Sequence, residues 1–91
     1  MASNAASVIT CRVRDAEGNP VAGARVFFAS GPGSYPDMAA LTNDAGEAIL
    51  AAPEPGTYEI QVAADGFAPE TEAVTVAAGE PITRDTIVKR A

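Results

Sequence analysis

The sequence predicts an all-β fold, a seven-stranded antiparallel or mixed Greek-key β-sandwich, on three observations. The chain has 91 residues, enough for one domain with a small core. Its Val and Ile residues number 13 against two Leu, and β-branched side chains favour strands. Its 8 Gly and 7 Pro are spread so evenly that no window remains for a long helix. We expect strands at residues 7–14, 24–29, 39–42, 47–52, 58–64, 70–77 and 82–89.

Alternation identifies the first of these strands, and composition identifies the second. In the first strand, Ile9, Cys11 and Val13 point one way and polar side chains the other, as in a half-buried strand. The second strand is apolar on both faces apart from Arg25, which indicates a central position or a cover on its second face. The Gly- and Pro-containing segment 30–37 reads as a loop.

Turn residues mark the middle of the chain. Residues 43–46 fit a type I turn in which Gly46 takes the left-handed conformation, and this turn joins the short third strand to the fourth. Pro55 and Gly56 fit a type II turn after the fourth strand. The fifth strand alternates from Tyr58 onward and is the clearest half-buried strand in the chain.

The last two strands alternate less regularly. In the sixth, Val74 and Val76 point inward, and a bend near Ala73 is expected to turn Glu70 and Glu72 outward. In the seventh, two adjacent apolar residues interrupt the pattern. Strands at this spacing, separated by turn signals, are typical of a sandwich.

The residue types that most often carry catalysis or bind metals are scarce. The chain has no His, one Cys and one Lys, so it lacks the usual general base, the usual zinc ligands and most pairs for covalent catalysis. We predict that it is not an enzyme and that it uses no cofactor and no metal. Cys11 has no partner for an intrachain disulfide and is predicted to be buried and unreactive.

Charge is distributed unevenly along the chain. The net charge is −6, and residues 26–83 contain nine acidic residues and no Lys or Arg. Such a surface is a poor partner for nucleic acid. Arg12, Arg14 and Arg84 lie on the expected first and last strands. We predict that they form a basic face which speeds association with a partner at low ionic strength.

Three motifs give the chain a resemblance to a known family. They are Asp-x-x-Gly-x-Pro-Val-x-Gly-Ala-x-Val at 15–26, Thr-Asn-Asp-Ala-Gly-Glu at 42–47, and Pro-Gly-Thr-Tyr-Glu-Ile-Gln-Val-x-Ala-x-Gly-Phe at 55–67. With them the chain resembles the carboxypeptidase regulatory-like domain family, whose sandwich is transthyretin-like or prealbumin-like and related to the immunoglobulin-like folds. The resemblance implies a bacterial-type, non-catalytic accessory domain that docks or spaces parts of a larger surface, secretion or enzyme assembly.

Two other function classes stay open. One is a carbohydrate-binding module, although starch-binding relatives stack sugars on exposed Trp and this chain has none. The other is an enzyme that works with carboxylates alone, which would need two acids with shifted pKa values in one cleft. Relatives that hydrolyse hydroxyisourate depend on His and a C-terminal Tyr-Arg-Gly-Ser, whereas this chain ends in Val-Lys-Arg-Ala.

The expected partner is a protein, with a second copy of the chain as a further option. Tyr35, Pro36 and Asp37 form the candidate interaction loop, because loops on a rigid sandwich often carry binding groups. The alternative for that loop is a plain connection between sheets. We expect a disordered lead at 1–6 and one domain at 7–91, no membrane insertion and no signal peptide. Cytosolic location and export by a signal-independent route both stay open, although the relatives are often extracellular or envelope-associated.

Overall fold

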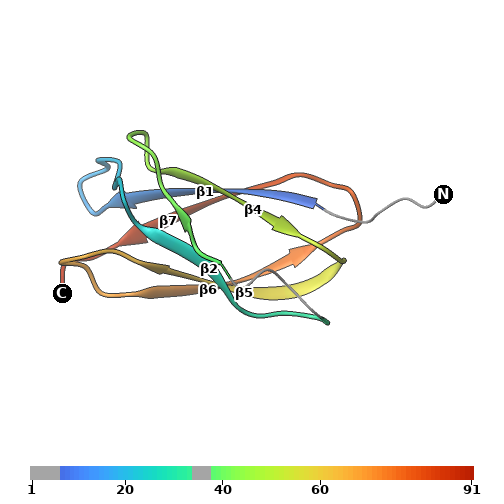
Figure 1. Cartoon of the computed structure of the whole chain (residues 1–91). Helices are drawn as coiled ribbons and strands as arrows, with labels where there is room; N and C mark the ends of the chain where they lie inside the picture. Colours follow the sequence, from blue (N-terminus) through green and yellow to red (C-terminus); the bar gives the residue numbers. More distant parts are fainter. Residues whose placement is uncertain (1–6, 34–37) are drawn as a thin grey trace.

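Seven strands in two facing sheets make up the computed structural model, which describes residues 7–33 and 38–91 (Figure 1). Each strand agrees with its predicted range to within two residues at either end, so the predicted all-β sandwich is confirmed. The strands are β1 (Ser7–Asp15), β2 (Arg25–Ser30), β3 (Ala40–Leu41), β4 (Glu47–Ala52), β5 (Gly56–Ala63), β6 (Glu70–Val76) and β7 (Ile82–Val88).

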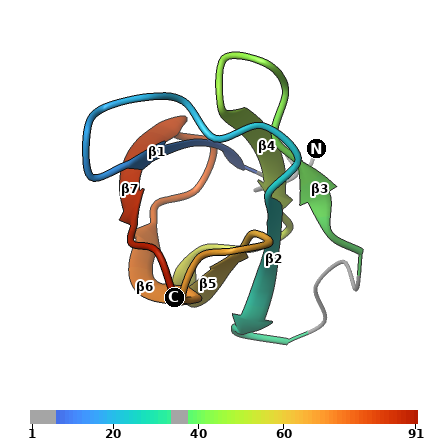
Figure 2. The ribbon, with the colours of Figure 1, turned by 90° about the vertical axis from the view of Figure 1, so that its left-hand side faces the viewer.

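The two sheets have different pairing patterns, and Figure 2 shows how their strands are arranged when the sandwich is viewed from one end. The first has the order β4-β1-β7, with β4 antiparallel and β7 parallel to β1. The second has the order β3-β2-β5-β6 and is antiparallel throughout. The central position predicted for β2 is therefore confirmed. The parallel pair is the feature that joins the first and last strands of the chain.

Alternating side chains of both sheets fill the space between the layers. Cys11 lies on the inner face of β1, where the sequence placed it, and it is buried. Tyr58 is the largest fully buried side chain, and its ring centroid lies 4.7 Å from that of Phe28 on the neighbouring strand. The other buried apolar residues include Ile9, Val13, Val26, Leu50, Ile60, Val62, Val74, Val76 and Val88.

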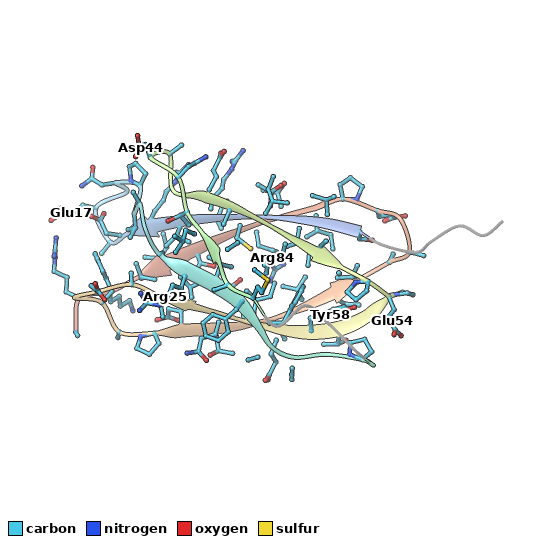
Figure 3. The ribbon with its side chains drawn as sticks, viewed as in Figure 1. Glu17, Arg25, Asp44, Glu54, Tyr58 and Arg84 are labelled. Carbon is cyan, nitrogen blue, oxygen red and sulfur yellow. The ribbon has the colours of Figure 1, made fainter. Side chains whose placement is uncertain are left out.

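Two buried or half-buried hydroxyls fix the loops to this core. The Thr42 hydroxyl donates to the carbonyl of Val21 at 2.6 Å and accepts from the amide of Ala24 at 2.9 Å. At the other end of the sandwich, the Tyr58 hydroxyl donates to the carbonyl of Glu54 at 2.6 Å and accepts from its amide at 3.1 Å (Figure 3). Backbone groups that would otherwise be unpaired near the core are satisfied in this way.

The predicted glycine turns are confirmed at one position and corrected at the other. Gly46 has a φ of 78°, the left-handed conformation expected between β3 and β4. Gly56 also has a positive φ, but its value of 140° is far from the ~80° of a type II turn. Gly56 is already the first residue of β5, so its backbone is more extended than a turn requires.

The predicted bend in the sixth strand is wrong. β6 pairs with β5 from Glu70 to Val76 with no shift of register. Glu72 lies opposite Ile60, a core residue, and therefore faces the same side of the sheet. Because β6 is an edge strand, an inward-facing carboxylate here can still reach water at the open side of the sandwich.

Candidate protein-interaction surfaces

Two of the three arginines of the predicted basic face lie on the outer surface of the first sheet. Arg12 and Arg14 alternate with the inward-facing residues of β1. Arg12 lies between Glu47 of β4 and Asp85 of β7 in the register of the sheet. Its Nε is 3.5 Å from Oε2 of Glu47. Acidic neighbours on both strands therefore surround the charge of Arg12.

Arg84 does not join these two arginines, so the expectation of one basic face has to be corrected. The parallel register places Arg84 beside Cys11, whose side chain points between the sheets. Neighbouring residues of paired strands share a face, so Arg84 also points to the inner side. Its Nε lies 3.8 Å from Oε1 of Glu72 in the opposite sheet, between the edge strands β7 and β6.

We call the open side that contains this ion pair the β6–β7 side, residues 70–76 and 82–88. Figure 2 shows it opposite the side formed by β3 and β4. Its strands carry four charged residues, and Glu72 and Arg84 occupy inward-facing positions on edge strands. Charges in such positions oppose the addition of another strand. The β6–β7 side is thus protected against edge-to-edge pairing.

We call the opposite open side the β3–β4 side, residues 38–42 and 47–53, and its one charged residue is Glu47, the partner of Arg12. Met38, Leu41 and Ile49 have exposed fractions of 78%, 65% and 62%. These are the highest values for large apolar side chains in the described part of the chain. Ile49 pairs with Thr10 of β1 and faces the outer side of the first sheet, whereas Leu41 pairs with Arg25 of β2 and faces the outer side of the second, so the two flank this edge of the sandwich. Exposed apolar side chains often mark a binding site for another protein. Sequence alternation alone did not find this surface, because it depends on which strands lie at the edges.

The environment of Cys11 confirms the prediction of a buried thiol. Burial is the main cause that raises the pKa of Cys11 to about 11, and the carboxylate of Glu72 raises it further while Arg84 acts in the opposite direction. Thiolate, the reactive form, is therefore scarce at neutral pH. The residue fills space in the core next to the ion pair of the β6–β7 side.

A cavity of about 360 Å³ lies where β1 and β7 end, lined by Asp15, Ala16, Glu17, Val88, Lys89 and Arg90. The carboxylate of Asp15 accepts hydrogen bonds from the amides of Asn19 and Glu17, each at 2.9 Å. These bonds, that of Asn19 first, lower the pKa of Asp15. A general acid at neutral pH needs the opposite shift. The Asp15 carboxylate thus shapes the loop.

The candidate interaction loop of Tyr35, Pro36 and Asp37 lies outside the described residues, so it stays a prediction. Within residues 7–33 and 38–91, no group of three His, Cys, Asp or Glu side chains could hold a metal ion. In the same ranges, no helix has the length and apolar character needed to cross a membrane.

Known structures with similar folds come from proteins of different kinds. The TIE protein of Bacillus anthracis matches with a TM-score of 0.74 and 15% identity, over 96% of this chain and 17% of that one. Phospholipase PlaB from Legionella pneumophila matches with a TM-score of 0.70 and 15% identity, over 99% of this chain and 26% of that one. A chain of a type II cohesin–X-dockerin complex from Acetivibrio cellulolyticus matches with a TM-score of 0.69 and 14% identity, over 90% of this chain and 56% of that one. At such identities the similarity shows the fold alone.

Sequence comparison places the chain more narrowly. No curated protein sequence matches it significantly. The model of the carboxypeptidase regulatory-like domain matches residues 8–89, nearly the whole length, and so includes all three motifs at 15–26, 42–47 and 55–67. The resemblance seen in those motifs is confirmed: the chain belongs to the carboxypeptidase regulatory-like domain family.

Proposed function

We propose that this chain is a non-catalytic docking or spacer module of a larger protein assembly, and that the β3–β4 side is its docking surface. The observation that carries the proposal is the exposure of Met38, Leu41 and Ile49 along the β3–β4 side, whose one charged residue, Glu47, is paired with Arg12. The rest of the sandwich keeps its large apolar side chains in the core or exposes them less. Exposed apolar residues gain free energy when a partner covers them.

The comparisons support a role within something larger. The chain spans between 17% and 56% of the three matched proteins described above, so in each of them this fold is one part of a longer chain. One of the three is a cohesin–X-dockerin complex, in which proteins bind each other. A position in a cell-surface or envelope assembly is part of the proposal and follows the family resemblance.

The size of the surface limits the affinity that it can provide. Complete burial of one large apolar side chain contributes about 1.5 to 3 kcal/mol. The three side chains together therefore contribute roughly 5 kcal/mol, since each is already partly covered. Association costs of at least about 4 kcal/mol must be offset. Docking here will be weak unless backbone hydrogen bonds or several copies reinforce it.

Site-specific crosslinking in the native cell tests the proposal. A photoreactive amino acid at Leu41 reports on the β3–β4 side, and the same amino acid at the exposed position of Ala73 on β6 is the matched control. We expect a discrete crosslinked protein from position 41 and none from position 73. Equal crosslinking at both positions, or none from position 41, would contradict docking at the β3–β4 side.

A further inference from the structure

The backbone of β4 shows which of its groups face away from the sheet. The carbonyl of Gly46 accepts a hydrogen bond from Val13 of β1, whereas that of Glu47 accepts one from Asn43 on the other side. Neighbouring residues of a strand direct their N–H and C=O groups to opposite sides. The N–H and C=O groups of Ile49 and Ala51 therefore point away from β1, like those of Glu47.

No strand in the described part of the chain pairs with this edge. β3 lies nearby but is two residues long, belongs to the other sheet and pairs with β2. The four backbone groups of Ile49 and Ala51 are thus available at the least charged side of the molecule. Unpaired groups of this kind form a template for another strand.

This edge is complementary to itself. An antiparallel copy that places Ile49 opposite Ala51 of the partner subunit makes two equivalent pairs, each exchanging two hydrogen bonds. All four free groups are used in that register. A shift by one residue pair in one direction would require Glu47 as a partner, but its amide and carbonyl are already bonded to Asn43. A shift in the other direction would require Pro53, which has no N–H to donate. The selected register also places Leu50 opposite its own copy on the core side.

Charge favours the same arrangement. Each copy has a net charge of −6, which opposes association of two copies in general. Residues 48–53 carry no charge, and Glu47 lies opposite Pro53 of the partner subunit in this register. Like charges are therefore not placed directly opposite each other. The same pairing at β6 would bring several carboxylates together.

We propose that two copies of this chain associate through their β4 edges, forming a continuous six-stranded sheet with Ile49 opposite Ala51 of the partner subunit. This inference rests on the proposed function, because it names the partner of the β3–β4 side.

Sedimentation velocity over a concentration series tests the association. We expect a monomer–dimer equilibrium with a Kd below about 1 mM, which corresponds to about 4 kcal/mol. Ile49→Lys places two lysines, one from each copy, diagonally across the interface on the same face of the sheet. Their repulsion should weaken the dimer at least tenfold. Ala73→Lys on β6 changes the net charge equally and should have no effect. A chain that is monomeric at about 1 mM, or equal weakening by both variants, overturns the proposal.

Ala51→Pro tests the backbone hydrogen bonds directly. Proline removes one N–H that faces the free edge and leaves the β1–β4 hydrogen bonds in place. We expect at least tenfold weaker association with a nearly unchanged melting temperature. Unchanged association would show that β4 is not the interface. If the purified chain stays monomeric while position 41 crosslinks to a different protein in the cell, the dimer is rejected and the docking function stands.

Discussion

The β6–β7 side and the β3–β4 side close the same sandwich by different means. The first is bridged by the ion pair of Glu72 and Arg84, at a distance of 3.8 Å between half-exposed side chains. The second is held by the buried hydroxyl of Thr42 and the tight turn at Gly46. Exposed ion pairs stabilise little, whereas a buried polar group without its partner is costly. We infer that the β3–β4 side is the firmer of the two.

This difference has a consequence for binding. Where charges at the rim close the sandwich, they also repel additional strands. Where buried hydrogen bonds close it, the rim needs no charge and can expose apolar side chains at little cost to stability. The surface of the β3–β4 side can therefore serve binding because the hydrogen bonds beneath it already provide stability.

The largest expected difference between the two sides concerns their turn glycines. Alanine at Gly46 would adopt a φ of 78° and would place its Cβ 2.5 Å from the carbonyl oxygen of Val13. Alanine at Gly79, between β6 and β7, has a similar φ of 72° but meets nothing within 4 Å. Left-handed backbone costs about 1 to 2 kcal/mol. We expect a loss of about 1 kcal/mol for Gly79→Ala and about 3 kcal/mol for Gly46→Ala.

Urea denaturation of both variants gives the two free energies of unfolding. Equal losses would show that the backbone near Gly46 relaxes easily, and the β3–β4 side would then not be the firmer one.

Alkaline pH tests the burial of Cys11 beside the β6–β7 ion pair. Its pKa is raised from 9.0 to about 11 in the folded chain. Below pH 9 the thiol is mostly protonated in both the folded and the unfolded chain. Between pH 9 and pH 11 the unfolded chain releases this proton, whereas the folded chain keeps it. The free energy of unfolding therefore falls as pH rises from 9 to 11, by between about 2 and 3 kcal/mol.

Cys11→Ala is the matched variant, since it removes only this thiol. We expect the difference in stability between the two proteins to shrink over this range. A difference that stays constant with pH would contradict a buried neutral thiol.

Removing the Thr42 hydroxyl tests the hydrogen bonds that hold the β3–β4 side. Thr42→Val keeps the shape of the side chain but leaves the carbonyl of Val21 and the amide of Ala24 without this partner. We expect a loss of about 2 kcal/mol, the usual cost of an unsatisfied buried group. Thermal unfolding measures this loss. Thr71→Val, at an exposed position of β6, is the control and should leave the stability nearly unchanged.

The smallest effect is expected for the ion pair itself. Because Glu72 and Arg84 are both partly exposed, a double-mutant cycle with Glu72→Gln and Arg84→Gln should give a coupling energy below about 1 kcal/mol. High salt should reduce it further. A coupling of several kcal/mol would mean that the β6–β7 side is held as firmly as its counterpart.

Local patterns in the sequence predicted the strands, the left-handed Gly46 and the burial of Cys11, because each depends on neighbours along the chain. Features that depend on pairing between distant strands could not be predicted. Arg84 faces inward because β7 pairs in parallel with β1, and alternation within β7 does not contain that register. Ile49 is exposed at an edge because β4 is the last strand of its sheet. The order of strands thus decided the candidate surface.

Residue-resolved amide exchange by NMR tests most directly whether the β3–β4 side is the surface through which this chain associates. Spectra of the purified protein are compared at low concentration and at about 1 mM. We expect the amides of Ile49 and Ala51 to exchange more slowly at the high concentration, while Thr71 and Ala73 on β6 stay unchanged. Protection that rises on β6 or β7 instead, or exchange at Ile49 and Ala51 that does not depend on concentration, would contradict association through the β3–β4 side.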